Sequence, residues 1–407
     1  MLLDKLVKSK YGPYSIIFFV AIIVYSLIYM FSGDFSVTAN NWFNSYSIQA
    51  ARWLDGHLDL EHNISWLEIA IFEGRYFISF PPFPSIVMLP FVFFMGTDTP
   101  DHAIALAISL LSLMYAYKIG AKFLTNRYHA VFLSLFLILG TNYLHISLWG
   151  AVWYIAQNMA FLFTLMAFYY ALTDNSRHSY ISLFAMCAAM GCRPFNALYL
   201  PVVLYLIYIR ENKTFTLYVK KVFIYAIPAI ILGVFFMWLN YARFGNIFEF
   251  GHNYLPEFTY DPHGQFYAGR ILSNLNRMFF DFNMTSFPLF HGFAFWVASP
   301  IFISYILYFF TYIFKKNQKD KSDYLILALP LLVLMHIVAF SFHRTLGGHQ
   351  FGSRYTVDTL VATYLGLLFI LKKIPPSNNV YFNIMPMLFG LLLNFFGTIE
   401  FLLFYFG

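Results

Sequence analysis

One glutamate, Glu68, has the surroundings of a general base. It lies in the stretch "WLEIAIFEGRYFISF" between Leu67 and Ile69, and a Gly-Arg-aromatic turn follows it. Apolar neighbours disfavour the charged form of a carboxylate, which raises its pKa and makes it a better proton acceptor. Asp34, just after the first long apolar segment, is the second candidate for the same role.

Other acids near Glu68 have a plainer interpretation. Asp55, Asp59 and Glu61 lie in "WLDGHLDLEHN", a polar turn that follows an amphipathic pattern, with Gly56 as the residue that ends the helix. Acids in such a turn are usually solvated, so we expect these three to have no catalytic role.

The basic residues divide by type along the chain. All 14 lysines gather in short clusters between apolar segments, whereas the eight cations far from these clusters are all arginines. A planar guanidinium binds phosphate through two parallel hydrogen bonds, so Arg193, Arg354 and Arg75 are candidate ligands of an anionic headgroup. Simpler alternatives remain open: insertion bias against lysine, a snorkelling Arg193, and an ion pair between Arg354 and Asp358.

The sequence contains only weak patterns for metal binding and none for nucleotide binding. The histidines in "DLEH" and "HRTLGGH" lack the tight spacing of metal ligands, so no metal site is predicted, although a divalent metal remains an open alternative. No glycine-rich phosphate loop, nucleophile elbow or basic aromatic patch is present, which argues against a nucleotide-dependent enzyme and against nucleic acid as a partner. Cys187 and Cys192 share one apolar segment and are interpreted as packing residues.

These residues must be positioned by elements within a membrane. The chain has 407 residues, of which 60% are hydrophobic and only 11% charged, whereas soluble domains are about a quarter charged. Apolar runs recur from Ile16 to the C-terminus, and backbone groups in lipid must be hydrogen-bonded within each segment. We therefore predict an all-α integral membrane protein, a single polytopic domain over residues 1–407.

Lysine clusters mark the cytoplasmic side, because cytoplasmic loops carry an excess of cations. They predict a cytoplasmic N-terminus and about eleven transmembrane helices in the plasma membrane. The predicted spans are residues 14–32, 103–121, 128–145, 151–172, 179–192, 194–210, 221–240, 293–314, 324–342, 355–371 and 380–405.

Two long loops then face outward, residues 33–84 and 241–292, and both are expected to carry juxtamembrane helices. The apolar run 85–95 is too short to cross a bilayer, so we predict a half-inserted helix there. The cytoplasmic loops are short, which places the functional residues on the outer face.

Four stretches carry a resemblance to a known family. They are "QAARWLDGHLDL" with "EIAIFEGRYFISFPPFPSIVMLP", then "WGAVWYIAQNMAFLF", "NYARFGNIFEFGHNYLPEF" and "GGHQFGSRYTVDTL". Together they resemble the polytopic glycosyltransferases of the C superfamily (GT-C), which take sugar from a polyprenyl-phosphate carrier on the outer face. Each motif is short, so the resemblance is to the superfamily and not to one member.

The resemblance implies a first outer loop with a catalytic acid. Many members place that acid directly after the first span, where this chain has the amide Asn41, so Glu68 in the acid-x-A-x-aromatic-x-G-R turn takes first place and Asp34 second. Arg193, Arg354 and Arg75 would bind the donor phosphate. Four residues would contact the sugar or the acceptor, Tyr76, His252, Tyr254 and Tyr355, although most aromatics in such a chain pack in the core or face lipid.

The expected activity is sugar transfer with inversion, from a polyprenyl-phosphate donor to a glycan, lipid-linked or protein acceptor, with no cofactor required by the sequence. The first alternative is a lipid-linked sugar flippase or a secondary transporter, although no internal repeat supports it. The second alternative is a non-catalytic partner in an envelope-polymer assembly.

Overall fold

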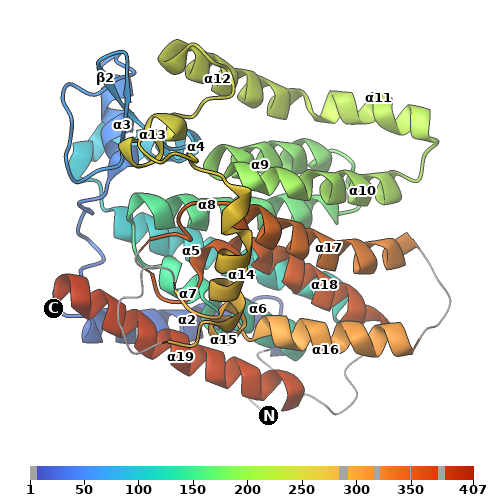
Figure 1. Cartoon of the computed structure of the whole chain (residues 1–407). Coiled ribbons are helices and arrows are strands. Elements are labelled where there is room, and N and C mark those ends of the chain that lie inside the picture. The colour runs from blue at the N-terminus through green and yellow to red at the C-terminus, as the bar shows by residue number, and fades with distance from the viewer. Residues whose placement is uncertain (1–6, 284–291, 316–320, 349, 375–380) are drawn as a thin grey trace. The chain divides into compact units, whose positions relative to one another are not determined.

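The computed structural model describes residues 7–283, 292–315, 321–348, 350–374 and 381–407 (Figure 1). Within these ranges the chain is almost entirely helical, and its strands form a two-stranded sheet. Parts of the sequence predictions lie outside the described residues: Lys5, Lys316 and Lys319 of the cation clusters, and positions 284–291 of the second predicted loop.

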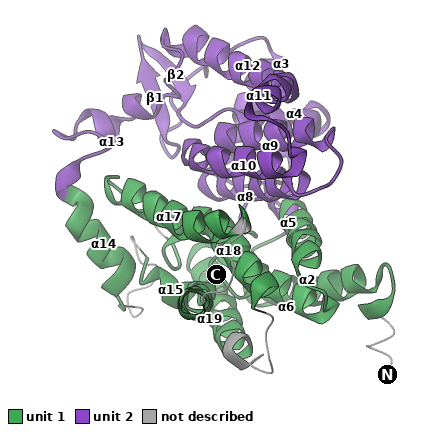
Figure 2. Cartoon of the chain, turned by 90° about the vertical axis from the view of Figure 1, so that its right-hand side faces the viewer, with its two compact units in different colours: residues 1–36, 107–148, 270–407 green, residues 37–106, 149–269 purple. Residues whose placement is uncertain are grey.

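The described residues form two compact units (Figure 2). Unit 1 comprises Met1–Ser36, Ala107–Leu148 and Arg270–Gly407, and unit 2 comprises Val37–Leu106 and Trp149–Gly269. Helix α5 (Asp101–Phe123) contributes to both. The other longer elements of unit 1 are α2 (Gly12–Phe31), α6 (Arg127–Leu139), α7 (Tyr143–Ile146), α14 (Ile271–Phe280), α15 (Phe295–Ala298), α16 (Ile301–Phe314), α17 (Lys321–Ser341), η5 (Arg354–Thr359), α18 (Leu360–Lys373) and α19 (Tyr381–Phe406).

Unit 2 holds the β-hairpin, the one sheet found among the described residues, and the other described helices. Its elements are α3 (Ser45–Leu54), β1 (Ile69–Phe72), β2 (Arg75–Ile78), α4 (Phe83–Met95), η1 (Gly96–Asp98), α8 (Val152–Ala171), α9 (His178–Cys192), η2 (Pro194–Tyr199), α10 (Leu200–Glu211), α11 (Phe215–Tyr225), α12 (Ile227–Phe244), η3 (His252–Tyr254), α13 (Pro256–Thr259) and η4 (Ala268–Arg270).

Seven helices in the described part of the chain are long and apolar enough to cross a membrane. They are Gly12–Phe31, Asp101–Phe123, Val152–Ala171, Ile227–Phe244, Asp323–Ser341, Arg354–Lys373 and Ile384–Phe406. Four apolar helices are shorter, Phe83–Asp98, Arg127–Leu139, His178–Cys192 and Ile301–Phe314. The prediction of a multi-pass, all-α membrane protein is therefore confirmed, whereas the count of eleven crossings remains a prediction.

Several predicted spans fall on interrupted helices. The predicted span 221–240 covers the end of α11 and most of α12, which meet at Ala226 with Pro228 in the first turn of α12. Proline lacks a backbone N–H and fits the first turn of a helix better than its interior. The predicted span 194–210 likewise begins as the 3₁₀ helix η2 at Pro194 before α10 starts.

The stretch after Glu68 forms a β-hairpin. Strands β1 and β2 pair antiparallel, with Ala70 opposite Phe77, and the turn consists of Glu73 and Gly74. Both turn residues have positive φ, 49° and 74°, as the tightest hairpin turns require. Ala70 and Phe77 are buried and pack against Phe244 of α12, which fixes the hairpin to the helical part of unit 2.

The hairpin turn supports a prediction. Glutamate at positive φ is strained by about 1–2 kcal/mol, whereas asparagine tolerates this conformation. Glu73→Asn is therefore expected to raise the free energy of unfolding by about 1 kcal/mol and to leave activity unchanged. Thermal unfolding of the purified protein checks this, with Gly74→Ala, which should destabilise, as the opposite control. A lower unfolding temperature for Glu73→Asn would contradict the turn geometry.

Helices α3 and α4 hold the region before and after the hairpin together. The hydroxyl of Ser85 in α4 donates to the Tyr46 carbonyl at 3.1 Å and bonds to the Gln49 amide at 2.8 Å. Helix α3 ends at Leu54, and Gly56 follows with φ of 81°, as predicted for the residue that ends this helix. A helix, α4, also forms where the half-inserted segment was predicted.

Candidate functional site

Six of the nine predicted site residues belong to unit 2. They are Glu68, Arg75, Tyr76, Arg193, His252 and Tyr254, whereas Asp34, Arg354 and Tyr355 belong to unit 1.

Glu68 lies directly before the hairpin and is half-buried. Its backbone carbonyl accepts a hydrogen bond from the Ser79 hydroxyl at 3.0 Å, and Ser79 directly follows the last residue of β2. The first strand pair, Ile69 with Ile78, comes next. This arrangement fixes the backbone of Glu68 at the open end of the hairpin.

His252 lies at the same end of the hairpin. Its Nδ1 is 2.7 Å from the Ser79 carbonyl oxygen. A carbonyl only accepts hydrogen bonds, so Nδ1 carries the proton and Nε2 presents a lone pair. Burial lowers the pKa of His252, and the positive charge of Arg193 lowers it further against the opposing effects of Ser79, Glu257 and Glu249. His252 is therefore a neutral acceptor at neutral pH.

Arg193 caps the C-terminal end of α9. Its backbone is extended, with φ of −145° and ψ of 110°, because the following Pro194 disfavours the helical conformation at this position. Burial raises the pKa of Tyr46 well above its ordinary value, and Arg193 lowers it whereas Glu68 raises it. Both charges therefore lie close enough to act on the Tyr46 hydroxyl.

Aromatic ring contacts through Phe80 join Tyr46 to His252. The rings of Tyr46 and Phe80 lie edge to face at 6.2 Å, and those of Phe80 and His252 at 5.4 Å. Tyr46 is 2% exposed and comes from α3, so helix α3, the end of β2 and the η3 turn converge here. We call the residues Tyr46, Glu68, Arg193 and His252 the acid–arginine cluster. It combines one carboxylate, one guanidinium and a neutral imidazole.

The other predicted residues of unit 2 have contacts within the hairpin region. Arg75 forms an ion pair with Asp59 at 2.9 Å, and its guanidinium also lies over the Phe77 ring. The hydrogen bond that Arg75 donates within this ion pair lowers the pKa of Asp59. Tyr76 pairs through its backbone with Leu60, and Tyr254 packs on the Phe72 ring at 4.6 Å. Asp59, expected to be merely solvated, instead has a structural partner.

Three predicted residues lie in unit 1. Asp34 is exposed, and its backbone N–H donates to the Phe406 carbonyl at 3.0 Å. Arg354 is 4% exposed, and its Nε donates to the Gly347 carbonyl at 2.9 Å. Its guanidinium also lies over the ring of Tyr355, 5.0 Å from the centroid. Arg354 is therefore a buried cation with a fixed orientation.

Asn41, the amide near the first predicted span, has a structural role. Its side-chain oxygen accepts from the Phe43 backbone N–H at 2.7 Å. Its own backbone N–H donates to the carboxylate of Asp101 at 3.2 Å, and Ser47 donates to the same carboxylate at 2.9 Å. Asp101 is 2% exposed and was not singled out from the sequence. It holds the start of α3 in place.

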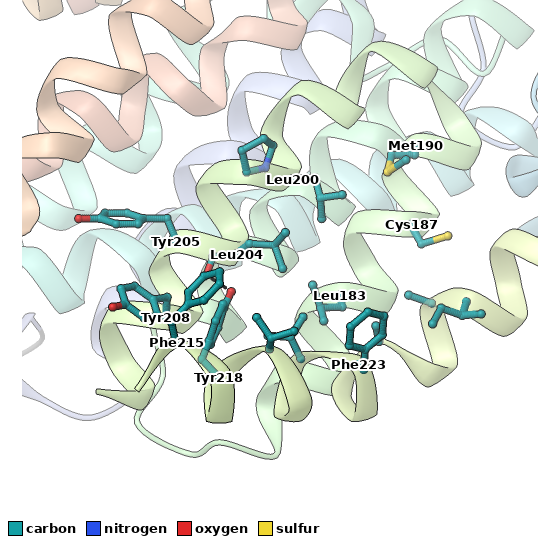
Figure 3. Close-up of a pocket in the computed structure, with 16 residues that line it drawn as sticks. Leu183, Cys187, Met190, Leu200, Leu204, Tyr205, Tyr208, Phe215, Tyr218 and Phe223 are labelled. Atoms are coloured by element: carbon teal, nitrogen blue, oxygen red, sulfur yellow. Dashed lines mark hydrogen bonds between the residues drawn. The ribbon is translucent and has the colours of Figure 1, made fainter. Parts of the chain in front are cut away.

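A groove of about 810 Å³ lies among α9, α10, α11 and α12 (Figure 3). Its lining is carbon-rich, and α9 contributes Leu183, Cys187 and Met190 along one face. This helix ends two residues beyond Met190, and Arg193 is its cap. The groove therefore runs along the helix whose end carries the guanidinium of the acid–arginine cluster.

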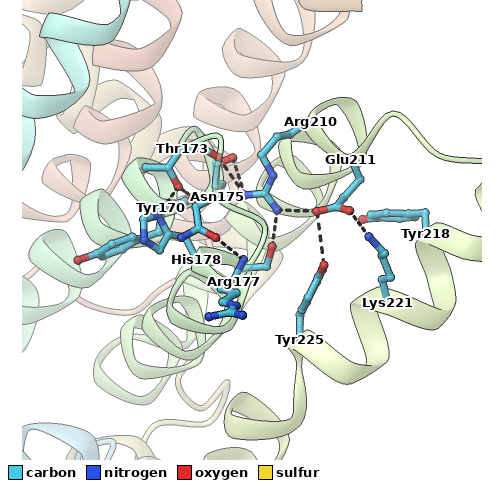
Figure 4. Close-up of polar contacts among 12 residues, drawn as sticks. Tyr170, Thr173, Asn175, Arg177, His178, Arg210, Glu211, Tyr218, Lys221 and Tyr225 are labelled. Atoms are coloured by element: carbon cyan, nitrogen blue, oxygen red, sulfur yellow. Dashed lines mark hydrogen bonds and ion pairs between the residues drawn. The ribbon is translucent and has the colours of Figure 1, made fainter.

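Ion pairs fix two walls of the groove beyond Tyr208 (Figure 4). Glu211, at the end of α10, pairs with Lys221 of α11 at 2.8 Å and with Arg210 at 3.2 Å. Arg210 also donates to the Thr173 carbonyl at 3.3 Å and to the Ser179 hydroxyl. These contacts tie α10 and α11 to the start of α9.

Metal binding receives no geometric support. In the part of the chain that the structure describes, no three His, Cys, Asp or Glu side chains gather in a way that could hold a metal ion. The requirement for a divalent metal is thus an untested alternative.

The neutral state of His252 gives a pH prediction. Its folded-state pKa lies below the ordinary value of about 6.5, so stability is fully present above that pH and is lost as the pH falls toward the folded-state pKa. His252→Gln should reduce the loss of stability that the wild type shows as the pH falls. Unfolding temperatures measured from neutral pH to about pH 5 check it, with the exposed His62→Gln as control. Parallel profiles for wild type and His252→Gln would contradict it.

The chain resembles solved structures in its fold. No protein-family model matches the chain, and no curated protein matches it. Among solved structures it is similar to ArnT from Cupriavidus metallidurans in the apo state, with a TM-score of 0.54 and 12% identity over 96% of this chain and 76% of that chain. It is likewise similar to ArnT bound to undecaprenyl phosphate, with a TM-score of 0.54 and 13% identity over 97% and 77%. At this identity the likeness shows a shared fold.

Proposed function

We propose that the chain transfers a sugar from a polyprenyl-phosphate donor to an acceptor on the outer face of the membrane. The observation that carries the proposal is the acid–arginine cluster, in which the carboxylate of Glu68 and the guanidinium of Arg193, from segments far apart in sequence, both act electrostatically on the buried Tyr46 hydroxyl. The fold supports it, because the solved structures of similar fold include ArnT bound to undecaprenyl phosphate, which is a polyprenyl phosphate. The proposal retains about eleven crossings with a cytoplasmic N-terminus.

The reaction is a single displacement with inversion. Glu68 takes the proton of the acceptor hydroxyl as its oxygen bonds to the anomeric carbon. The bond from that carbon to the phosphate oxygen breaks, and its electron pair leaves with the polyprenyl phosphate. Arg193 stabilises the charge that develops on the phosphate. His252, through Nε2, accepts a hydrogen bond from a sugar or acceptor hydroxyl.

The groove beside α9 would hold the hydrocarbon chain of the donor. Its apolar lining suits an isoprenoid chain, and it runs along the helix that Arg193 caps. A cavity of about 150 Å³ holds one benzene molecule, so 810 Å³ accommodates on the order of thirty carbons. With the chain in the groove, the phosphate lies toward Arg193 and the sugar toward Glu68.

The remaining predicted residues enter the proposal with distinct roles. Arg354 and Arg75 would be further phosphate ligands, and Arg75 would have to release Asp59 to act in this way. Tyr76, Tyr254 and Tyr355 would contact sugar or acceptor. Asp34 would act as base in place of Glu68 only if Glu68 proves dispensable.

An assay in sealed vesicles tests the proposal against transport. Purified protein is reconstituted with a labelled polyprenyl-phosphate sugar and an acceptor extract. Transfer predicts that label becomes covalently attached to the acceptor while free polyprenyl phosphate accumulates. Label that crosses the bilayer still attached to its carrier would instead identify a flippase, and no change in either quantity would favour a non-catalytic partner.

A further inference from the structure

Helix α3 carries a row of buried polar groups on one face. Tyr46, Gln49 and Trp53 follow one another at spacings of three and four residues, which places them on the same side of a helix. The Tyr46 hydroxyl, the Gln49 Nε2 and the Trp53 Nε1 are each buried without a hydrogen-bond partner among the described residues. We call these three residues the α3 polar face. The Ser45 hydroxyl, at the start of the helix, is also buried without a hydrogen-bond partner among the described residues.

The other polar side chains of α3 do have partners. Ser47 bonds to Asp101, and Arg52 donates to the Asp59 carbonyl and to Glu61. The unbonded groups are thus concentrated on one face and not spread around the helix. A buried polar group without a partner costs about 1–3 kcal/mol, so native proteins retain a row of them where something else supplies the bonds.

The chemistry of the α3 polar face points to a neutral, oxygen-rich ligand. Trp53 only donates, the Gln49 amide presents an end that has no partner in either orientation, and Tyr46 both donates and accepts. None of the three carries a charge at neutral pH, so an anionic phosphate is better served by Arg193. Hydroxyl and ring oxygens of a sugar accept from all three, and tyrosine and tryptophan rings also offer apolar faces to a sugar ring.

Position relates this face to the acid–arginine cluster. Tyr46 belongs to both, since Glu68 and Arg193 act electrostatically on its hydroxyl. Gln49 lies one turn further along α3, about 4.5 Å along the axis, and Trp53 follows after another turn. A donor whose phosphate contacts Arg193 therefore has its sugar beside Tyr46 and Gln49.

We propose that the α3 polar face recognises the hydroxyls of the sugar on the donor, and so determines which sugar the protein accepts. This assignment rests on the proposed function, because it takes the donor phosphate to lie at Arg193. It differs from the reaction chemistry, since Tyr46, Gln49 and Trp53 act on binding and selectivity and not on proton transfer.

Binding of two lipids tests the assignment without relying on catalysis. Affinities of the purified full-length protein are measured for a polyprenyl phosphate and for the same lipid carrying a hexose or a pentose. Wild type is expected to bind one of the sugar-bearing lipids more tightly than the bare lipid. Tyr46→Phe should weaken binding of that sugar-bearing lipid about 10-fold and leave the bare lipid unchanged.

Matched variants control for folding. Tyr46→Phe removes only an unbonded hydroxyl, so its unfolding temperature without ligand should equal or exceed that of wild type. Trp53→Phe removes a second hydrogen-bond donor of the α3 polar face, the indole N–H, independently of Tyr46. Tyr260→Phe, at a tyrosine that is 84% exposed, is the control that should have no effect. Selectivity among hexose- and pentose-bearing lipids should narrow in Tyr46→Phe and Trp53→Phe only.

Each other outcome has one meaning. If Tyr46→Phe and Trp53→Phe keep the wild-type ratio of affinities for the two lipids, the α3 polar face does not read the sugar. Tyr46→Phe could instead lower the unfolding temperature and weaken binding of the bare lipid and of the sugar-bearing lipid equally. In that case the Tyr46 hydroxyl of the wild type is bonded to structural water, and the assignment is wrong. If wild type binds neither lipid, the proposed function itself fails, and the sugar assignment fails with it.

Discussion

Glu68→Gln is expected to lower kcat for sugar transfer about 10²- to 10⁴-fold, the range over which a general base contributes. Glutamine keeps the size and shape of the side chain, but it replaces one acceptor oxygen with an NH2 group and cannot accept the proton of the acceptor hydroxyl. KM for the donor should change little, because the phosphate and the hydrocarbon chain are bound elsewhere. Steady-state transfer with a synthetic donor measures both quantities.

The matched control for this variant is Glu61→Gln. Glu61 belongs to the same loop, and its side chain is 71% exposed in an ion pair with Arg52. Loss of an exposed ion pair of this kind has a small effect on stability, so Glu61→Gln should transfer sugar at the wild-type rate. If Glu68→Gln retains transfer within a few-fold of wild type, Glu68 is not the base and Asp34 becomes the first candidate.

Arg193→Lys is expected to weaken binding of polyprenyl phosphate about 10- to 100-fold. Lysine keeps the charge but replaces a planar fork with a single ammonium, so the paired hydrogen bonds to phosphate are lost. Arg193→Ala should weaken binding further and should lower kcat as well, because the charge on the leaving phosphate is then not neutralised. Equilibrium binding to the bare lipid measures the first effect without any transfer reaction.

Arg127→Lys is the control for the guanidinium effect. Arg127 donates to the carbonyls of Lys8 and Ser9 at 3.1 and 2.9 Å, and it lies on the predicted cytoplasmic side. Binding of the lipid by Arg127→Lys should equal that of wild type. Unchanged binding by Arg193→Lys and Arg193→Ala would assign the phosphate to another cation, with buried Arg354 next in order.

The sequence was sufficient for the class of fold. Long apolar runs require helices in a membrane, and most of the described helices lie near the predicted boundaries, with predicted span 221–240, which covers parts of α11 and α12, as an exception. Interruptions within runs were harder to place, because the break at Ala226 depends on Pro228 and the hairpin depends on the Glu73–Gly74 turn between two runs of only four residues. Short strands next to charged residues give a weak pattern in a chain dominated by helical signals.

Three members of the candidate site, Glu68, Arg193 and His252, were proposed from the sequence, whereas Tyr46 and Gln49 were not. Glu68 and Arg193 were identified because a charge among apolar residues is expensive and therefore informative. Tyr46 and Gln49 gave no such signal, since tyrosines are common in this chain and an amide in a helix is ordinary. Only burial without a hydrogen-bond partner distinguishes them, and burial depends on packing between α3 and α4. The partner of Arg75, Asp59, depends in the same way on the loop that leads to the hairpin.

The most direct test of the account is the structure of the protein in a lipid nanodisc with a non-hydrolysable polyprenyl-phosphate sugar. We predict density for the phosphate within hydrogen-bonding distance of Arg193, the hydrocarbon chain in the groove among α9, α10, α11 and α12, and the anomeric carbon facing Glu68. Phosphate density away from Arg193, with Glu68 distant from the sugar, would contradict the proposed site.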